Sequence, residues 1–277
     1  MQIGAAIQET MEKISSRIPP EQRQAQKTSK SLFPKSREEA LRCSCQDPTS
    51  CPYRGYIPYE EYIEGYGRVD KVVECPKYQK YLRQLWIKNK LEQSLPDKHR
   101  NHTFENFEAR SKDSSKALKI TKRYLAKQAW RQGANVVLLG KYGAGKTHLS
   151  AAVVHAAIEK FNTAAFVNAP RLNEGGFEAI ERRFEYLRSP DLVVIDDLSN
   201  ETDNKLINKH LYTLVNNRYE AEKGLMITAN LPIDAFREVL GERIFDRFRE
   251  RTAFVRINDV ESYRAKNRDK YLGWMEE

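Results

Sequence analysis

The sequence has few cysteines and no long hydrophobic run. Only four of its 277 residues are cysteine, and no run approaches the roughly 18 apolar residues that a membrane-spanning helix needs. Residues 1–10 lack the basic flank and the long apolar segment of a secretory signal. We therefore expect a soluble protein of the cytoplasm that makes no contact with a membrane.

Strong compositional biases are absent as well. Hydrophobic residues make up 40% of the chain and charged residues 31%, with 13 glycines and 11 prolines. These values exclude a collagen-like repeat and a wholly disordered chain. We find no internal repeat and no low-complexity tract, and the length suits one or two domains.

The chain is basic, but no block of lysine and arginine dominates it. The formal net charge is +9; residues 1–100 hold 18 basic and 13 acidic residues, and the remainder holds 29 and 25. Excess positive charge favours a polyanionic partner such as nucleic acid. Because the excess is spread over the chain, a nucleic-acid site must be a local arrangement on a folded surface.

All four cysteines fall in one short module. Cys43, Cys45, Cys51 and Cys75 lie in a stretch rich in Tyr, Pro and Gly, a composition typical of short strands and turns. Clustered thiols in a cytoplasmic chain usually bind metal, and the spacing C-x-C-x5-C-x23-C can supply four thiolates to zinc. An iron–sulfur cluster and reduced free thiols are the alternatives.

The surroundings of this module suggest a domain boundary. Amphipathic helices are predicted over residues 5–18 and 77–91, and a boundary follows at residues 94–97. We therefore divide the chain into an N-terminal domain, 1–95, and a second domain, 96–277. His99 and His102 are candidate substitutes for a cysteine ligand, but they lie beyond the boundary, where we expect them to line the second domain.

From residue 103 onward, short apolar runs alternate with stretches of helical spacing. The runs cover residues 135–139, 164–168, 192–195, 225–228 and 254–257. Runs that are apolar throughout are typical of a parallel sheet that is buried on both faces. We predict an α/β domain with a five-stranded parallel sheet, followed by one final helix over 262–272.

The most specific motif lies between the first strand and a predicted helix over 147–160. Residues 140–147 read GKYGAGKT, which matches the phosphate-binding loop G-x-x-x-x-G-K-[ST]. Glycines let successive N–H groups turn toward a phosphate, and the helix N-terminus adds its positive dipole end. We expect Lys146 to reach the β- and γ-phosphates and Thr147 to ligate Mg²⁺. The predicted nucleotide-binding residues are Gly140, Lys141, Tyr142, Gly143, Ala144, Gly145, Lys146, Thr147 and His148.

Two further strands end in polar side chains. The run 192–195 ends at Asp196 and Asp197, at the edge of a parallel sheet where ligands bind. We assign Asp196 to the metal and Asp197 to the attacking water; the alternative is that Asp197 only caps the next segment. Asn230 either positions the water or only opens the turn before Pro232.

A predicted helix over 241–249 carries a further candidate group. Arg243 and Arg247 are four residues apart and share one face of it. A guanidinium can neutralise the charge of a transferring phosphoryl group and is often supplied by a neighbouring subunit. Surface ion pairing is the commoner role of arginines in helices.

In this order the motifs resemble the DnaC/DnaI family of bacterial replicative-helicase loaders, which are AAA+ ATPases related to the initiator DnaA. The segments that carry the resemblance are TFENF (103–107), GKYGAGKTHL (140–149), LVVIDDL (192–198), ITAN (227–230), LGERIFDRFRE (240–250) and SYR (262–264). The match as a whole covers about 175 residues. The cysteine module resembles the metal-binding N-terminal domain of the DnaI branch.

The resemblance implies an ATP- and Mg²⁺-dependent P-loop core without a helical lid domain. It implies that residues 1–95 bind the hexameric, DnaB-type replicative helicase and that the protein helps to place this helicase on single-stranded DNA during replication initiation. It also implies that the protein assembles with itself on binding ATP. Carried over by position, Asn230 is sensor I, Arg247 is an arginine finger that acts across a subunit boundary, and Arg264 is sensor II on the final helix. The FENF segment, 104–107, falls near the adenine.

Asp197 departs from the pattern of many AAA+ ATPases, which have Glu there. Because Asp is one methylene shorter, we expect slow ATP hydrolysis, as suits a switch. Initiator-type AAA+ proteins grip single strands through an insertion where this chain has a predicted helix over 177–187. That segment supplies both basic and aromatic side chains: Arg182, Arg183, Arg188, Phe177, Phe184 and Tyr186. They suit backbone and base contacts, although the aromatics can also simply pack inward.

A second basic helix is predicted over 112–131. It carries a stripe at i+3/i+4 spacing: Lys112, Lys116, Lys119, Arg123 and Lys127. A solvated face explains the stripe, and phosphate contact is the alternative.

Two other functions compete with a helicase loader. One is an IstB-type ATPase that directs a transposase, against which the cysteine module argues. The other is a nucleotide-binding adaptor without significant hydrolysis, against which the joint presence of Lys146, Asp196, Asp197 and Arg247 argues.

Overall fold

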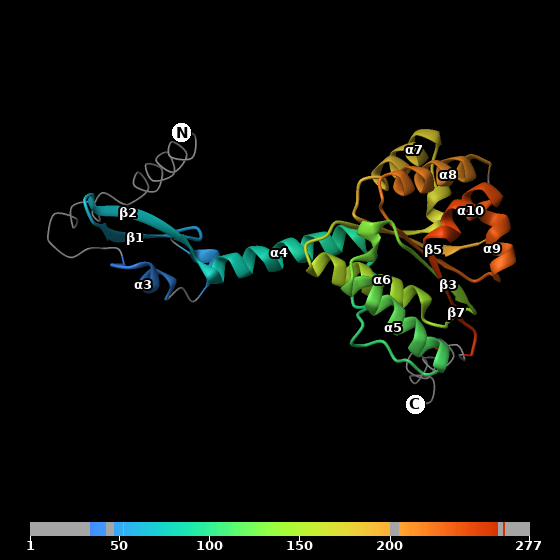
Figure 1. The fold of residues 1–277 in the computed structure, drawn as a ribbon, viewed down its shortest axis with the longest axis horizontal. Helices are drawn as coiled ribbons and strands as arrows, with labels where there is room; N and C mark the ends of the chain where they lie inside the picture. Colours follow the sequence, from blue (N-terminus) through green and yellow to red (C-terminus); the bar gives the residue numbers. More distant parts are fainter. Residues whose placement is uncertain (1–33, 43–46, 52, 200–204, 260–262, 264–277) are drawn as a thin grey trace, which may run out of the picture. The chain divides into compact units, whose positions relative to one another are not determined.

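The computed structural model describes residues 34–42, 47–51, 53–199, 205–259 and 263 of the chain. The chain divides into two compact units, Met1–Trp86 and Ile87–Glu277, both drawn in Figure 1. The division falls inside the long helix α4 (Pro76–Ser94). In the part of the chain that the structure describes, no helix is long and apolar enough to cross a bilayer.

The first unit is built on a β-hairpin. Strands β1 (Tyr56–Ile63) and β2 (Gly67–Glu74) pair antiparallel along their whole length, after a short helix α3 (Arg37–Leu41) and a 3-10 turn η2 (Pro48–Ser50). Buried residues Ala40, Ile57, Tyr59, Val73 and Cys75 form its small core. The short strands predicted from the composition are confirmed. The helix predicted over 5–18 lies outside the described residues.

Helix α4 confirms the helix predicted over 77–91 and extends beyond it at both ends. Its last residues belong to the second unit. The hydroxyl of Ser94 donates a buried hydrogen bond of 2.7 Å to the carbonyl of Ala164, and Leu95 is only 2% exposed. The end of α4 is therefore anchored on the second unit before the next segment, the 3-10 turn η3 (Asp97–His99), begins.

The second unit contains a parallel five-stranded sheet. Its strands are β3 (Asn135–Gly140), β4 (Ala164–Asn168), β5 (Leu192–Leu198), β6 (Leu225–Ala229) and β7 (Thr252–Ile257). They are arranged in the order β4-β5-β6-β3-β7, and all neighbours are parallel. The central strands β3, β5 and β6 are buried almost throughout, as their continuous apolar runs predict. The five predicted strands and the α/β fold class are confirmed.

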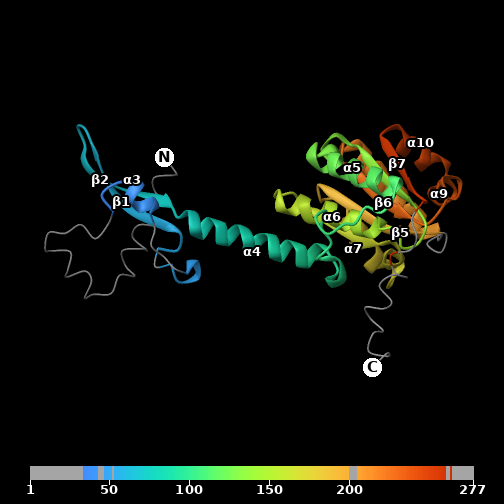
Figure 2. The ribbon, with the colours of Figure 1, turned by 90° about the horizontal axis from the view of Figure 1, so that it is seen from below.

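Helices cover both faces of this sheet, as Figures 1 and 2 show. Helices α5 (Lys112–Ala126) and α6 (Lys146–Glu159) lie on one face. The other face is covered by α7 (Phe177–Tyr186), α8 (Lys205–Glu220), α9 (Ile233–Leu240) and α10 (Glu242–Glu250). The strand order accounts for this division. The chain runs from β3 past two strands to β4 and then returns across the sheet, and crossovers of the same hand in opposite directions place their helices on opposite faces.

One predicted helix is too long. The sequence pattern extends from residue 112 to 131, but α5 ends at Ala126, and Gln128 adopts a left-handed φ of 46°. A 3-10 turn η4 (Ala129–Gln132) follows. The chain turns here because Trp130 is completely buried and packs edge-on against Tyr124, with ring centroids 5.5 Å apart.

Candidate nucleotide-binding site

The phosphate loop connects β3 to α6. Gly143 and Gly145 adopt φ angles of 74° and 87°, in the left-handed region that glycine enters without steric cost. A Cβ on Gly145 would also lie 2.7 Å from the ring of Phe107. Gly145 is thus required for two reasons, the backbone turn and the close approach of an aromatic ring.

The side chain of Lys146 is held in place from several directions. The residue is only 6% exposed, and its Nζ donates to the carbonyls of Gly140 and Lys141, both at 2.8 Å. It also donates to Oδ1 of Asn230, at 2.6 Å. An ammonium held in this way is preorganised for an anion at the mouth of the loop, because little side-chain freedom remains to be lost on binding.

Asn230 connects Lys146 to the second acid of the site. It follows β6, and its Nδ2 donates to Oδ1 of Asp197. The three residues therefore form one chain, Lys146–Asn230–Asp197, as expected if the carboxyl edges of neighbouring strands meet. Asn230 does more than open the turn before Pro232.

Asp197 has an unusual backbone conformation. It lies inside β5 with a φ of 62°, where the pairing of β5 with β6 shifts register, and its N–H donates to the hydroxyl of Thr228 at 2.9 Å. Asp and Asn enter the left-handed region more readily than most residues. Because β5 continues to Leu198, Asp197 lies within the strand and does not stand directly before a helix.

Asp196 faces the loop from the same strand and is 2% exposed. Its carboxylate accepts from Thr228 at 2.7 Å and from Thr147 at 3.1 Å. Burial raises the pKa of Asp196, and the neighbouring Asp197 charge adds to the effect, while the two threonine hydrogen bonds oppose it. A buried carboxylate beside a threonine hydroxyl is a donor set that suits Mg²⁺, whose charge would offset the cost of burial.

Three histidine rings pack beside the loop. His148, the second residue after Lys146, has Nε2 2.9 Å from both the carbonyl of Thr103 and Oδ1 of Asn106. The His102 ring stacks on it with centroids 4.4 Å apart and planes 8° apart, and His99 Nδ1 lies 3.2 Å from His102 Nδ1. Burial lowers the pKa of His99 and of His102 to about 4 and also lowers that of His148. At neutral pH the three rings are therefore uncharged and do not repel one another.

These contacts fix the FENF segment against the loop. Phe107 meets the His148 ring edge-on at 5.2 Å and covers Gly145. The expectation that His99 and His102 line the second domain is confirmed. No local sequence signal indicates the stack, because its members lie on segments more than forty residues apart.

The chain also returns to the loop near its end. The N–H of Tyr263 donates to the carbonyl of Gly143 at 3.1 Å, and the Arg110 guanidinium lies 4.6 Å from the Tyr263 ring centroid. Arg264 itself lies outside the described residues. The sensor II role of Arg264 therefore stays a prediction.

The candidate arginine finger lies on α10. Arg243 and Arg247 are both exposed, and Nη1 of Arg247 donates to Oδ1 of Asn216 on α8. Among the described contacts, none joins Arg247 to the phosphate loop of its own chain. The arginine-finger role of Arg247 therefore stays a prediction.

Helix α7 divides its basic and aromatic side chains between interior and surface. Phe184 is buried and stacks on His210 at 5.1 Å, and Arg183 donates to the carbonyls of Leu172 and Glu174. These two side chains therefore hold the helix in place. Phe177 and Tyr186 are more than half exposed, and the side chains of Arg182 and Arg188 are 73% and 40% exposed.

The cysteine module is only partly described. Cys51 and Cys75 are buried and are not joined in a disulfide, whereas Cys43 and Cys45 lie outside the described residues. Among the residues that the structure describes, no group of three or more His, Cys, Asp or Glu side chains could hold a metal ion. The four-thiolate zinc site therefore stays a prediction.

Comparison with known proteins agrees with this geometry. Residues 63–271 match the family of IstB-like ATP-binding proteins. The replicative helicase loader DnaC of Escherichia coli K12 is 25% identical over 177 residues, which cover 61% of this chain and 71% of DnaC. A protein of Sinorhizobium fredii, named for an insertion sequence and for ATP binding, is 32% identical over 146 residues, or 49% of this chain and 48% of that protein.

The fold has solved relatives as well. A crystal structure of DnaI aligns with a TM-score of 0.53 and 17% identity, covering 61% of this chain and 93% of that structure. The resemblance to DnaC and DnaI inferred from the motifs is confirmed, and so is the P-loop core of AAA+ type.

Proposed function

Because the chain belongs to the family of IstB-like ATP-binding proteins, we propose that it is an ATPase that binds the hexameric, DnaB-type replicative helicase and helps to place it on single-stranded DNA. The single observation that carries the ATPase part is the hydrogen-bonded chain Lys146–Asn230–Asp197 beside the Thr147–Asp196 pair. The DnaC relatives support the loader part. We propose that the protein acts in the cytoplasm.

The phosphate loop binds the nucleotide through its own residues. Backbone N–H groups of residues 140–148 surround the phosphates, Lys146 neutralises charge on the β- and γ-phosphates, and Thr147 and Asp196 hold Mg²⁺. Mg²⁺ held by Thr147 and Asp196 would supply charge neutralisation to the phosphates. The FENF segment and His148 form the wall on which the adenine rests.

Hydrolysis depends on Asp197 and Asn230. Asp197 orients and deprotonates the attacking water. Asn230 bonds both this carboxylate and Lys146 and so fixes their relative position. The short side chain of Asp197 reaches less far than a glutamate would, so we expect slow turnover. Slow turnover suits a protein whose ATP-bound state must persist while a partner is positioned.

Assembly connects the nucleotide to DNA. Arg247 completes the ATP site of the next subunit, and Arg264 contacts the nucleotide bound to its own chain. Successive subunits then align their α7 helices, whose exposed Phe177, Tyr186 and Arg182 stack on bases and bind phosphates of a single strand. Residues 1–95 form the helicase contact, with zinc holding the cysteine module together.

Co-elution with the host replicative helicase tests the proposal. The full-length chain is expected to form a complex with the helicase on gel filtration in the presence of ATP and Mg²⁺. The Lys146→Ala variant is the matched control, because it should retain the helicase contact on residues 1–95 but lose every effect of ATP. Absence of a helicase complex with and without ATP would refute the loader role.

An IstB-type ATPase that directs a transposase is the second candidate. The family match and the insertion-sequence relative of Sinorhizobium fredii favour it. The two roles differ in partner, so stimulation of a transposase encoded beside this gene, without helicase co-elution, would favour the second. ATP binding without measurable hydrolysis would instead support an adaptor.

A further inference from the structure

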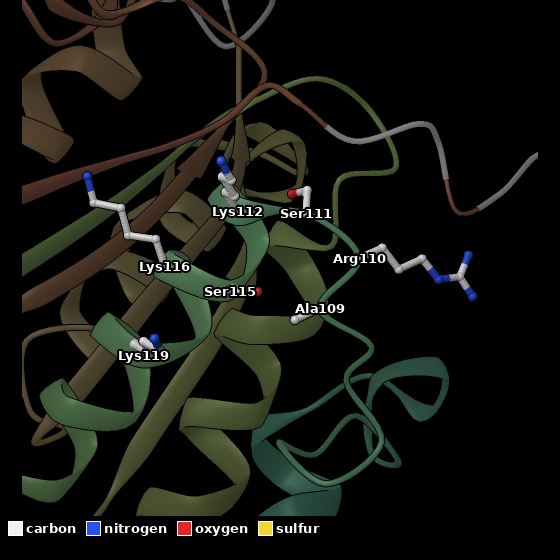
Figure 3. Close-up of a pocket in the computed structure, with 7 residues that line it drawn as sticks. All are labelled: Ala109, Arg110, Ser111, Lys112, Ser115, Lys116 and Lys119. Atoms are coloured by element: carbon white, nitrogen blue, oxygen red, sulfur yellow. The ribbon is translucent and has the colours of Figure 1, made fainter.

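Helix α5 carries a stripe of cations along its solvent face. Lys112, Lys116, Lys119 and Arg123 are exposed and follow one another at helical i+4 and i+3 spacing, and Lys127 continues the row at the end of the helix. Figure 3 shows the first three beside a shallow hollow that is also lined by residues 109–111 and Ser115. We define the α5 stripe as these five residues.

In the described part of the chain, no ion pair joins the α5 stripe to an acid; at the start of the helix, the Asp259 carboxylate accepts from the N–H of Asp113 at 3.4 Å. By contrast, Arg182 on α7 pairs with Glu178 of its own helix, and Arg249 on α10 pairs with Asp246. No such ion pair involves the stripe. The one acid of α5, Asp113, accepts from the N–H of Asn258 at 3.0 Å and is thereby committed to another segment.

This arrangement is unfavourable for the helix by itself. Like charges at i,i+4 repel each other, and Lys112 lies in the first turn, where the helix dipole disfavours a cation. The helix start is already capped by Ser111 and Ser114, and the N–H of Asp113 donates to the Asp259 carboxylate, so its backbone N–H groups do not need a further anion. An external polyanion that neutralises the side chains would remove the repulsion.

The side chains of α5 itself favour duplex over single-stranded DNA, and the Tyr263 ring beside the hollow is already occupied by the Arg110 guanidinium, 4.6 Å from the ring centroid. None of the exposed large hydrophobic residues lies on α5, and its one aromatic side chain, Tyr124, is 5% exposed. Single-strand sites combine positive charge with aromatic stacking platforms, as α7 does with Phe177 and Tyr186. Duplex backbones are bound by Lys and Arg without stacking.

The length of the α5 stripe also agrees with the spacing of phosphates along a duplex. At a rise of 1.5 Å per residue, Lys112 and Arg123 lie about 16 Å apart along the axis. One strand of a duplex carries about five phosphates over that length. We propose that the α5 stripe binds the phosphate backbone of duplex DNA, independently of sequence.

The two DNA surfaces lie on opposite faces of the sheet. Helix α5 covers one face and α7 the other (Figure 1). The duplex contact does not depend on the loader role, and the proposed single-strand contact on α7 is a separate surface. A chain that carries both can hold a duplex and a single strand at once, as at a junction between them.

Fluorescence anisotropy with the full-length chain tests the proposal. The probes are a labelled 30-base-pair duplex and a 30-nucleotide single strand, titrated between about 50 and 200 mM salt. Lys116→Gln combined with Lys119→Gln is expected to weaken duplex binding at least tenfold. It should reduce the slope of log K against log salt by about two, since each phosphate contact contributes about 0.9. Single-strand and ATP binding should not change.

Two controls make the result decisive. Lys88→Gln with Lys160→Gln removes the same charge from exposed positions elsewhere, and Lys116→Arg with Lys119→Arg keeps the charge in place and should restore duplex binding. Equal losses in the Lys88/Lys160 control would overturn the proposal, because net charge alone would then explain the effect. An unchanged duplex affinity, or an equal loss of single-strand binding, would overturn it as well.

Discussion

Replacing Asp197 by asparagine separates nucleotide binding from hydrolysis. The Asn230 Nδ2 bond to Oδ1 of residue 197 can persist, because asparagine keeps that acceptor. The backbone at φ 62° also accepts asparagine, whereas alanine would cost about 1–2 kcal/mol there. Asp197→Asn therefore removes the carboxylate charge without disturbing the loop.

The expected loss is in turnover alone. Removing a general base lowers a rate by about 10²–10⁴-fold, which corresponds to about 3–5 kcal/mol in the activation barrier. ATP affinity should stay within about threefold of wild type, because Lys146 keeps its other hydrogen bonds to Gly140 and Lys141. Steady-state phosphate release and equilibrium binding of a fluorescent ATP analogue measure the two quantities.

Asp191→Asn is the matched control. Asp191 directly precedes the same strand, at the end opposite the phosphate loop. In the described hydrogen bonds, its carboxylate accepts only from Thr163. Its replacement should leave turnover within about twofold of wild type. If Asp197→Asn hydrolyses ATP as fast as this control, Asp197 is not the general base.

Three further outcomes are expected. Asp196→Asn should raise the thermal midpoint of the nucleotide-free protein at pH 7. Burial raises the pKa of Asp196 above its usual 3.8, so the ionised carboxylate destabilises the folded state. In melts from pH 3 to 8 the gain should vanish toward the acid end, where Asp196 is protonated in both states. Arg247→Ala should bind ATP within about threefold of wild type yet fail to assemble in sedimentation velocity, and normal assembly would contradict the finger role. Elemental analysis of the full-length protein should find about one zinc per chain. Chelation should reduce the near-UV ellipticity, because the first unit loses its packing. Absence of zinc and iron would contradict the metal module.

Local sequence signals were sufficient for the sheet and for the phosphate loop. The strands are continuous apolar runs, and the loop is one contiguous motif, so both can be recognised within a short window. Asp196, Asp197 and Asn230 could be placed together because parallel strands end at a common edge. The structure brings these predicted residues into contact.

Contacts between distant segments could not be predicted in this way. Thr228 bonds both Asp196 and the backbone of Asp197, but in the sequence it is only one more β-branched residue of a strand. Tyr263 reaches Gly143 across about 120 residues. The helix over 112–131 was predicted too long because its periodicity continues through Trp130, whose burial turns the chain.

The anchored end of α4 determines how the ATPase part can be isolated. A fragment that starts at residue 96, as the sequence pattern suggests, would lack Ser94 and Leu95. It would leave the Ala164 carbonyl without its donor and open the site that Leu95 fills. A stable fragment should instead start at or before Ile87, where the second unit begins. Expression and limited proteolysis of fragments starting at 87 and 96 would therefore locate the working boundary of the domain inside a helix and not in a linker.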